Sequence, residues 1–270
     1  MKIILDKNKL SKLINNERNL GFVPTMGAIH AGHLSLISRS NELCKKTIVS
    51  IFVNKPQFNN KEDFKKYPKF LKKDIKKLKK LKVDYLYMPK AKEVYPNGHN
   101  INIKISSFKN KLCGQFRPGH FEAVVDVVNN FVKIIKPKKV FFGEKDMQQL
   151  VIIKRFFKNR YKNLKIINCK TIREKDGLAL SSRNLNLTSK QRLIGSSIYD
   201  FILKNKLFFN NGKKTHLKYI KKKIIKLGAN KIDYIELLNV KKLLDENSNK
   251  KEYRLFIAYY LGNVRLIDNI

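Results

Sequence analysis

Two histidines stand three residues apart in the segment PTMGAIHAGHLSL, directly after a short apolar run. His30 and His33 follow Pro24 and Gly27, which turn the chain, and they precede a pattern typical of a helix. The N-terminus of a helix offers unpaired N–H groups and a positive dipole end, so it is a prepared site for a phosphate. The segment therefore favours phosphoryl or nucleotidyl chemistry. A single HxGH is also compatible with a turn that carries one capping histidine.

Other polar residues follow two further apolar runs. Lys145 comes after the run that ends at Gly143, in the segment GEKDMQQL, and Gln57 follows the run at 47–54. Because ligands of open parallel sheets bind at the carboxyl ends of the strands, these residues are candidates for one site. Lys145 can reach a phosphate as a mobile charge, whereas Gln57 and Gln149 suit a hydroxyl or carboxylate. The alternatives are one more solvated lysine and two loop amides satisfied by the protein.

Two loops add hydroxyl groups and cations. The segment IREKDGLALSSRN combines a turn at Asp176 and Gly177 with two serines and an arginine, a composition that can wrap a triphosphate but is also common in loops. The segment GQFRPGHF places Arg117 and His120 before an apolar helix. This histidine is as compatible with helix capping as with substrate contact.

The elements that position these motifs alternate between short β-branched runs and helical patterns, which predicts βα units around a parallel sheet. Candidate strands are Leu20–Thr25, 47–54, 83–88, Lys139–Gly143 and 164–171. Candidate helices are 33–44, 70–81, 121–135 and Met147–Lys158. The sequence therefore predicts an α/β fold with a Rossmann-like parallel sheet.

The pattern changes after about residue 173. Two helical stretches, 188–206 and 213–227, are followed by the run IDYIELLNV and by two apolar runs that flank Gly262 and Asn263, a dipeptide suited to a hairpin turn. We therefore expect a catalytic domain at 1–173 and a small α+β domain at 174–270, which would act as a lid for the site.

Composition narrows the function classes. The formal net charge of +38 could attract nucleic acid or an anionic membrane, but the excess is nearly all lysine and is spread along the whole chain, so we expect no specific nucleic-acid partner. No stretch reaches the roughly 18 to 20 apolar residues of a membrane span, and the N-terminal run breaks at Asp6, which predicts a cytoplasmic protein without a membrane partner. The spacing of Cys44, Cys113 and Cys169 indicates three reduced, partly buried thiols and no zinc site.

Taken together, the motifs resemble those of the pantothenate synthetases, or pantoate–β-alanine ligases, a family of the HIGH-motif nucleotidyltransferase superfamily. The segments that carry the resemblance are PTMGAIHAGHLSL, SIFVN followed by QF, EDFKKYP, RPGHF, VFFGEKDMQQL, REKDGLALSSRN and the terminal RLIDN. They occur in the family's order and at about its spacing, from about residue 20 to 269. The combination is far more specific than any one motif.

The resemblance implies an ATP-dependent condensation of pantoate with β-alanine through a pantoyl adenylate. His33 would donate a proton, His30 would steady the pentacovalent phosphorus, and Lys145 is the third residue expected in catalysis. Gln57 and Gln149 would hold pantoate. ATP would contact Met26, Gly27, Ala28, Ile29, His30, Ala31, Gly32, His33, Gly143, Glu144, Lys145, Asp146, Ile172, Leu180, Ser181, Ser182 and Arg183. Magnesium is implied by the triphosphate, without protein ligands that we can assign, and a homodimer is implied by the family.

Two other classes of function are compatible with parts of the sequence. The first is another small-molecule adenylyltransferase, against which Gln57 and Gln149 argue, because a phosphorylated acceptor would need further cations. The second is a basic RNA-binding module, which would not need HxGH, GEKD and SSR in one chain. Tight binding of one RNA at physiological salt would distinguish it from nonspecific attraction.

Overall fold

The computed structural model describes residues 1–100, 102–209 and 212–270, and the chain divides into two compact units. The first unit comprises Met1–Glu144 and Gln148–Lys170, and the second comprises Lys145–Met147 and Thr171–Ile270. The short segment Lys145–Met147 thus groups with the C-terminal part of the chain, although the residues on both sides of it belong to the first unit. The predicted site residues are therefore divided between the two units.

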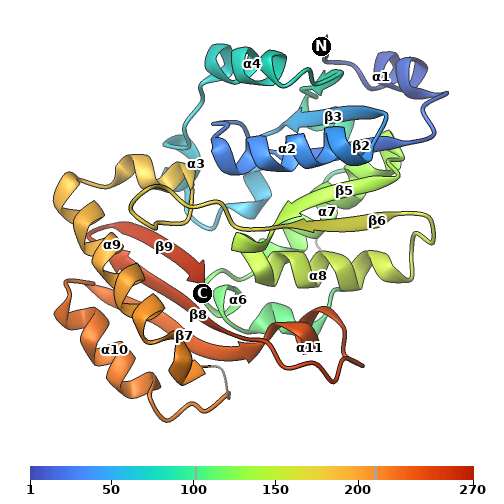
Figure 1. The fold of residues 1–270 in the computed structure, drawn as a ribbon. Coiled ribbons are helices and arrows are strands. Elements are labelled where there is room, and N and C mark those ends of the chain that lie inside the picture. The colour runs from blue at the N-terminus through green and yellow to red at the C-terminus, as the bar shows by residue number, and fades with distance from the viewer. Residues whose placement is uncertain (101, 210–211) are drawn as a thin grey trace. The chain divides into compact units, whose positions relative to one another are not determined.

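In the described part of the chain, six parallel strands form the sheet of the first unit, in the order β1-β4-β3-β2-β5-β6 (Figure 1). The strands are β1 (Lys2–Ile4), β2 (Leu20–Thr25), β3 (Lys46–Ile51), β4 (Tyr85–Tyr87), β5 (Lys139–Gly143) and β6 (Lys165–Cys169). The sequence predicts five of them but not β1, whose three residues are too few to set up a pattern. The predicted α/β fold is confirmed.

The connections reverse direction between β2 and β5, which lie side by side in the sheet. From β2 the chain proceeds to β3 and β4 on one side, whereas from β5 it proceeds to β6 on the other side. Their register pairs Gly21 with Lys139 and Phe22 with Val140, so both strands point the same way. In open parallel sheets, ligands bind beyond the carboxyl ends of the strands at such a reversal. The ends of β2 and β5 are therefore where the fold places a site.

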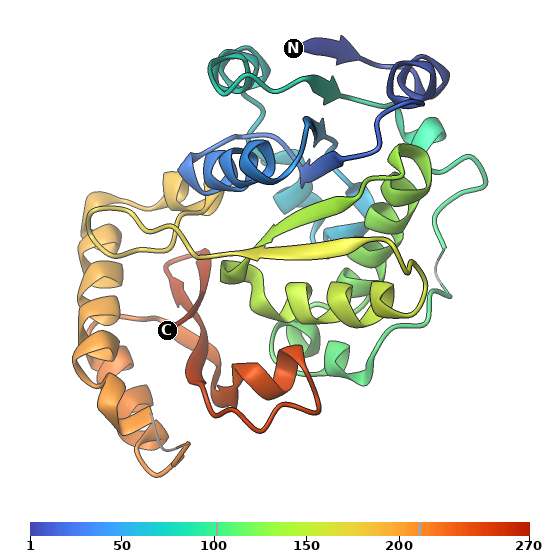
Figure 2. The ribbon, with the colours of Figure 1, turned by 45° about the vertical axis from the view of Figure 1, so that its right-hand side comes forward.

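Helices cover both faces of this sheet (Figure 2). The helices described between β1 and β6 are α1 (Lys7–Ile14), α2 (Ala31–Leu43), α3 (Lys61–Lys65), α4 (Leu71–Lys80), α5 (Ala91–Val94), α6 (Cys113–Phe116), α7 (His120–Ile135) and α8 (Met147–Lys158). Val23 and Val49 pack in one buried cluster with Ile37 of α2. The neighbouring Phe22 turns to the other face, where its ring centroid lies 5.5 Å from that of Phe131 in α7. This alternation is what the period of a strand requires. Among the described residues, no helix has the length and apolar character needed to cross a membrane.

The second unit contains an antiparallel sheet and two longer helices. Its elements are α9 (Ser189–Lys204), α10 (Leu217–Lys226), β7 (Lys231–Asn239), α11 (Val240–Leu244), β8 (Tyr253–Leu261) and β9 (Val264–Asn269). Ile198, Ile220 and Ile257, from α9, α10 and β8, are each at most 1% exposed and share one core cluster. Gly262 has a φ of 57° in the turn between β8 and β9, so the predicted hairpin is confirmed.

Candidate functional site

The HxGH segment begins with a sharp turn after β2. The hydroxyl of Thr25 donates to the carbonyl of Ser50 in the next strand at 2.6 Å and accepts a hydrogen bond from the N–H of Gly27 at 3.2 Å. Gly27 and Ala28 have φ values of 84° and 51°, which a residue with a Cβ adopts only at a cost. The chain therefore leaves the sheet in a left-handed conformation that the surrounding contacts must stabilise.

A buried carboxylate from α4 binds this turn. Asp74 is 2% exposed, and its two oxygens accept hydrogen bonds from the N–H groups of Ala28 at 2.9 Å and Ile29 at 2.8 Å. The ammonium group of Lys77, one turn later, binds the carbonyl of Ile29. Asp74 stands in none of the motifs that predict the site. It lies within the apolar stripe of a lysine-rich helix, next to Ile75, and an acid on such a stripe is the signal that could have identified it.

His30 and His33 lie at the start of α2. His30 is the N-cap residue, and its N–H donates to Nδ1 of His33 at 3.4 Å. The two imidazole rings are 4.0 Å apart between centroids. Because Nδ1 of a neutral His33 acts as the acceptor, its proton resides on Nε2, on the other side of the ring. The motif therefore brings two half-buried imidazoles and a helix N-terminus together, as predicted from the sequence.

Gln57 is held by a network of amides and ring groups. It ends the 3₁₀ helix Lys55–Gln57, and its side chain donates to the sulfur of Met26 at 2.9 Å and accepts from Nδ2 of Asn54 at 3.2 Å. Asn54 is 1% exposed, and it also accepts from the hydroxyl of Tyr95 at 2.8 Å and donates to the carbonyl of Ala123 at 3.2 Å. Gln57 thus lies beside the HxGH turn. Asn54 and Tyr95 were missed, because an amide at the end of a strand has no distinctive sequence context.

The RPGHF segment supports the same loop. Nδ1 of His120 is 2.8 Å from the carbonyl oxygen of Gln57, and a guanidinium nitrogen of Arg117 donates to that oxygen at 3.1 Å. The second guanidinium nitrogen lies 3.0 Å from Nε2 of His120, which is 7% exposed. The sequence leaves helix capping and substrate contact open for this histidine. Its observed contacts are with the backbone that carries Gln57.

The end of β5 contributes Gly143 and Glu144, both half-buried. Glu144 accepts a hydrogen bond from Nδ2 of Asn168 at 2.7 Å. The two glutamines that follow differ in their environment. Gln148 is buried and donates to the carbonyls of Phe108 and Lys111 at 2.9 and 2.6 Å, so it holds a loop together, whereas Gln149 is half-exposed in the first turn of α8.

The second unit contains the other predicted ATP contacts. The ammonium group of Lys145 is 3.4 Å from the carboxylate of Asp146, and the carbonyl of Lys145 accepts from Nδ2 of Asn269 at 3.0 Å. Ile172 is 37% exposed, and its carbonyl accepts from the N–H of Leu180 at 3.0 Å. The pairing of 172–180 as a short hairpin confirms the expected turn.

Ion pairs and amides hold that hairpin inside the second unit. Arg173 forms a bidentate pair with Asp268 of the terminal RLIDN segment, at 2.6 and 2.9 Å. Asn184 is buried and donates to Glu174 at 2.8 Å. The intervening residues Ser181, Ser182 and Arg183 are half-buried, and the hydroxyl of Ser181 accepts from the N–H of Arg183 at 3.2 Å. Two motifs that are far apart in sequence are thus joined by one ion pair.

The first unit therefore brings together one part of the predicted site. The side-chain amide of Gln57 contacts the sulfur of Met26, the first residue of the segment from Met26 to His33. Gly143 ends β5, which pairs with β2, the strand that precedes this segment. Lys145, Asp146, Ile172 and the segment 180–183 belong to the second unit.

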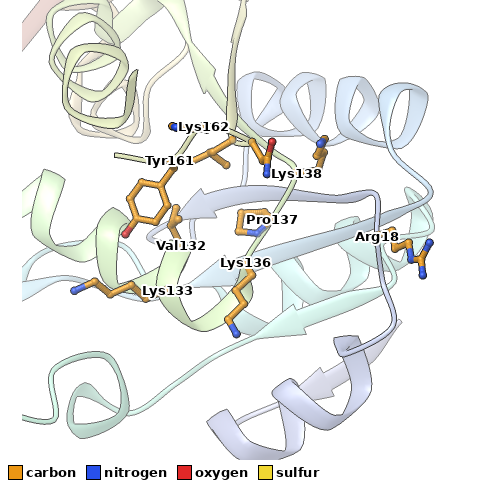
Figure 3. Close-up of a pocket in the computed structure, with 10 residues that line it drawn as sticks. Arg18, Val132, Lys133, Lys136, Pro137, Lys138, Tyr161 and Lys162 are labelled. Atoms are coloured by element: carbon orange, nitrogen blue, oxygen red, sulfur yellow. The ribbon is translucent and has the colours of Figure 1, made fainter. Parts of the chain in front are cut away.

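A cavity of about 490 Å³ lies elsewhere in the first unit (Figure 3). Its walls come from residues that precede β2, β5 and β6, at the amino ends of the strands. They are Arg18, Val132, Lys133, Lys136, Pro137, Lys138, Tyr161, Lys162, Asn163 and Leu164. None of these described lining residues is acidic, and Figure 3 shows Val132, Pro137 and Tyr161 among the cations. The cavity contains no predicted site residue and lies at the opposite edge of the sheet from the HxGH turn.

The six-stranded parallel sheet with its helices and the small antiparallel sheet of the C-terminal unit define an α/β protein. A family model described as pantoate-beta-alanine ligase matches residues 2–270, and the chain belongs to this family. The resemblance inferred from the motifs is thereby confirmed.

Named relatives agree with the family over nearly their whole length. The chain is 43% identical over 272 residues to a pantothenate synthetase of Francisella tularensis subsp. novicida, with 99% of this chain and 96% of that protein covered. It is 40% identical over 258 residues to a pantothenate synthetase of Thermodesulfovibrio yellowstonii, with 94% and 91% covered.

Solved structures of the family have the same fold. Pantothenate synthetase from Thermus thermophilus matches with a TM-score of 0.89 at 30% identity, covering 100% of this chain and 99% of that one. Pantoate-beta-alanine ligase from Francisella tularensis, described as complexed with beta-gamma ATP and beta-alanine, matches with a TM-score of 0.83 at 39% identity, covering 100% and 97%.

Proposed function

We propose that this protein is a ligase that joins pantoate to β-alanine, consumes ATP, and releases AMP and pyrophosphate through a pantoyl adenylate. The observation that carries this proposal is the HxGH turn, which places His30 and His33 at the N-terminus of α2, beyond the end of β2 and next to β5. Membership of the pantoate-beta-alanine ligase family specifies the substrates. The Francisella relative that is described as bound to beta-gamma ATP and beta-alanine supports two of them.

In the first half-reaction, a carboxylate oxygen of pantoate attacks the α-phosphorus of ATP and the bond to the β-phosphate oxygen breaks, so that pyrophosphate leaves. Charge increases on the equatorial oxygens as this bond forms. We assign His33 as the proton donor: once protonated to the imidazolium, it would give its Nε2 proton to the departing pyrophosphate and remain as a neutral imidazole. His30 and the helix N-terminus stabilise the same charge.

In the second half-reaction, the neutral amine of β-alanine attacks the acyl carbon. The bond from that carbon to the phosphate oxygen breaks, AMP leaves with the oxygen, and the proton that the amine loses passes to solvent water. We assign Gln57 and Gln149 to the hydroxyl and carboxylate groups of pantoate, since amides can donate and accept at once. Because water would hydrolyse the adenylate, the intermediate has to be shielded until the amine arrives.

We assign the residues of the second unit to the nucleotide. Lys145, Asp146 and Ile172 would contact ATP together with Met26 to His33, Gly143 and Glu144, and the segment from Leu180 to Arg183 would close on the phosphates. Lys145 would offset the charge of the triphosphate, and its side chain is 18% exposed. The small C-terminal domain, which we place at 174–270, would then act as a lid.

Magnesium would arrive with ATP as part of the substrate. Mg²⁺ commonly takes its ligands from substrate phosphates and water, with one or two carboxylates from the protein. Among the described residues, no three His, Cys, Asp or Glu side chains gather as a metal site.

We further propose that the protein works as a cytoplasmic homodimer without a specific nucleic-acid partner. The net charge of +38 and cations such as those around the cavity at the amino ends of the strands predict weak polyanion binding. Such binding falls steeply with salt and ignores sequence.

The proposal is tested by mass spectrometry of products after incubation with ATP, magnesium and pantoate, with and without β-alanine. We expect pantothenate and AMP in the complete mixture, and pantoyl adenylate when β-alanine is omitted. A well-folded sample that yields neither product would refute the assignment. An adenylylated acceptor other than pantoate would favour another adenylyltransferase.

Two histidine variants test the role of His33. His33→Ala should lower adenylate formation by about 100-fold or more, in the range of general acid catalysis. His216→Ala removes an exposed histidine of the second unit and should leave the rate unchanged. A folded His33→Ala variant with a normal rate would remove this residue from the mechanism.

A further inference from the structure

We infer that Asp74 is a positioning residue, whose buried carboxylate sets the conformation of the HxGH turn and thereby the position of His30 and His33. It acts through the N–H groups of Ala28 and Ile29, from which it accepts hydrogen bonds. The role in catalysis rests on the proposed function, whereas the effect on the turn does not.

The contacts explain how one side chain can control the turn. Two successive N–H groups converge on one carboxylate, a geometry that requires the left-handed conformation of Gly27 and Ala28. Ala28 and Ile29 are 6% and 1% exposed, so water cannot replace the carboxylate as acceptor. Buried N–H groups without an acceptor are costly, and the turn would rearrange to satisfy them.

Packing connects the carboxylate to the rest of the site. Leu78, one turn after Asp74 in α4, is fully buried in the cluster that contains Ile29 and Ile37. Lys77 binds the carbonyl of Ile29, so α4 holds both backbone groups of this residue. A shift of α4 is therefore transmitted to Ile29, which directly precedes His30. The position of His30 and His33 therefore depends on the contacts between α4 and Ile29.

The turn has little room for another conformation. A Cβ added to Gly27 would lie 3.2 Å from a side-chain carbon of Ile51 and 3.3 Å from a carboxylate oxygen of Asp74. Both contacts are tighter than ordinary van der Waals distances, so the neighbouring atoms already define the path of the chain. The carboxylate of Asp74 is therefore one of the neighbours that fix the path of the turn.

The variant Asp74→Asn tests this inference with little change in shape. An asparagine has one acceptor oxygen and one NH₂ group, so one of the two N–H groups would face a donor. Asp84 offers a matched control in the same unit. Its carboxylate accepts from the N–H of Thr47 at 2.9 Å and pairs with Lys46 at 2.8 Å, at the start of β3 and away from the HxGH turn. Asp84→Asn therefore removes a similar contact without touching the site.

The first measurement is independent of activity. The chain has five histidines, so its imidazole ¹H–¹⁵N spectrum is simple and can be assigned with single His→Gln variants. Asp74→Asn should shift the signals of His30 and His33 and leave those of His99 and His216 in place. Asp84→Asn should shift neither pair. Unchanged His30 and His33 signals in a folded Asp74→Asn protein would overturn the inference, whatever the enzyme's reaction.

The second measurement separates positioning from binding. Misplacing catalytic groups by about 1 Å can cost about 100-fold in rate, so Asp74→Asn should lower kcat for adenylate formation about 10- to 100-fold. The KM for ATP should change much less, and Asp84→Asn should keep the kcat of the unmodified protein. Equal losses of kcat in the two variants would indicate a general effect on stability and contradict a positioning role.

Discussion

Replacing Asn54 with alanine removes an amide that joins three parts of the first unit. Its oxygen accepts from the hydroxyl of Tyr95, and its nitrogen donates to the carbonyl of Ala123 and to the side chain of Gln57. Asn54 is 1% exposed and Ala123 is 7% exposed, so water does not take the place of the amide. The substitution therefore leaves the hydroxyl of Tyr95 without its acceptor and removes one contact of Gln57, the residue that we assign to pantoate.

The magnitude follows from those groups. Burial, and secondarily the charge of Asp126, raises the pKa of Tyr95 above its usual value, so the hydroxyl stays protonated and needs an acceptor. A buried polar group that loses its partner costs about 1–3 kcal/mol. Because the carbonyl of Ala123 lies inside α7 and keeps its helical hydrogen bond, the loss falls mainly on the hydroxyl of Tyr95, and we expect Asn54→Ala to lower the free energy of unfolding by about 1–3 kcal/mol.

A matched control is available at another tyrosine–asparagine pair. The hydroxyl of Tyr161 donates to Oδ1 of Asn129 at 2.8 Å, and both residues are half-buried. Asn129→Ala removes this single bond where water can replace it, which costs about 1 kcal/mol. Because the chain has no tryptophan, urea unfolding is best followed by far-UV circular dichroism.

The kinetic part of the prediction concerns Gln57. Once Asn54 no longer orients it, the KM for pantoate should rise while the KM for ATP changes little. Asn129→Ala should alter neither constant. The reasoning is refuted if both variants lose the same stability, or if Asn54→Ala leaves the KM for pantoate unchanged.

Three further outcomes follow from buried or strained groups. Burial raises the pKa of Asp126, so the folded state favours the protonated carboxyl over the charged one. The stability that protonated Asp126 contributes is complete below its unfolded pKa and is lost as the pH rises through its folded pKa. Asp126→Asn should therefore stabilise the protein more at pH 7 than at pH 3, as thermal unfolding would measure. Burial raises the pKa of Cys169 to about 11, so iodoacetamide at pH 8 should modify it at least about tenfold more slowly in the folded protein than in urea, by peptide mass spectrometry. Gly177→Ala should destabilise more than Gly98→Ala, because both glycines have positive φ but only the first would bring a Cβ within 2.1 Å of the ring of Tyr199.

Much of the fold could be predicted because its signals are local. The strand Leu20–Thr25 and the strand Lys139–Gly143 are continuous apolar runs, and Gly262 with Asn263 is a strong turn signal. The strand Lys2–Ile4 could not be predicted, since it is stabilised by pairing with a distant strand and not by its own pattern. Hydrophobic periodicity predicts only those strands and helices whose own residues carry the pattern.

The site was predictable to a different degree. His30, His33 and Gln57 stand in recognisable motifs, and the structure places them in one unit. Asp74 and Asn54 act through contacts with residues 46 and 69 positions away, so no local pattern describes their partners. The grouping of Lys145 with the second unit also depends on distant contacts, such as the one with Asn269.

Several acids of this chain bind particular donors of the backbone or of a motif, and the basic composition makes these contacts informative. Lysine and arginine number 59 against 21 aspartates and glutamates, so an exposed acid is attracted to cations on every side and gains little from any particular position. Asp74 instead binds backbone N–H groups, Asp268 binds Arg173, and Glu174 binds Asn184 and Arg192. In each contact the acceptor is a carboxylate that a lysine could not replace, because the partner is itself a donor. In so basic a sequence, an acid that interrupts an apolar stripe or a run of lysines therefore identifies the residues that hold the candidate site in place better than the abundant cations do.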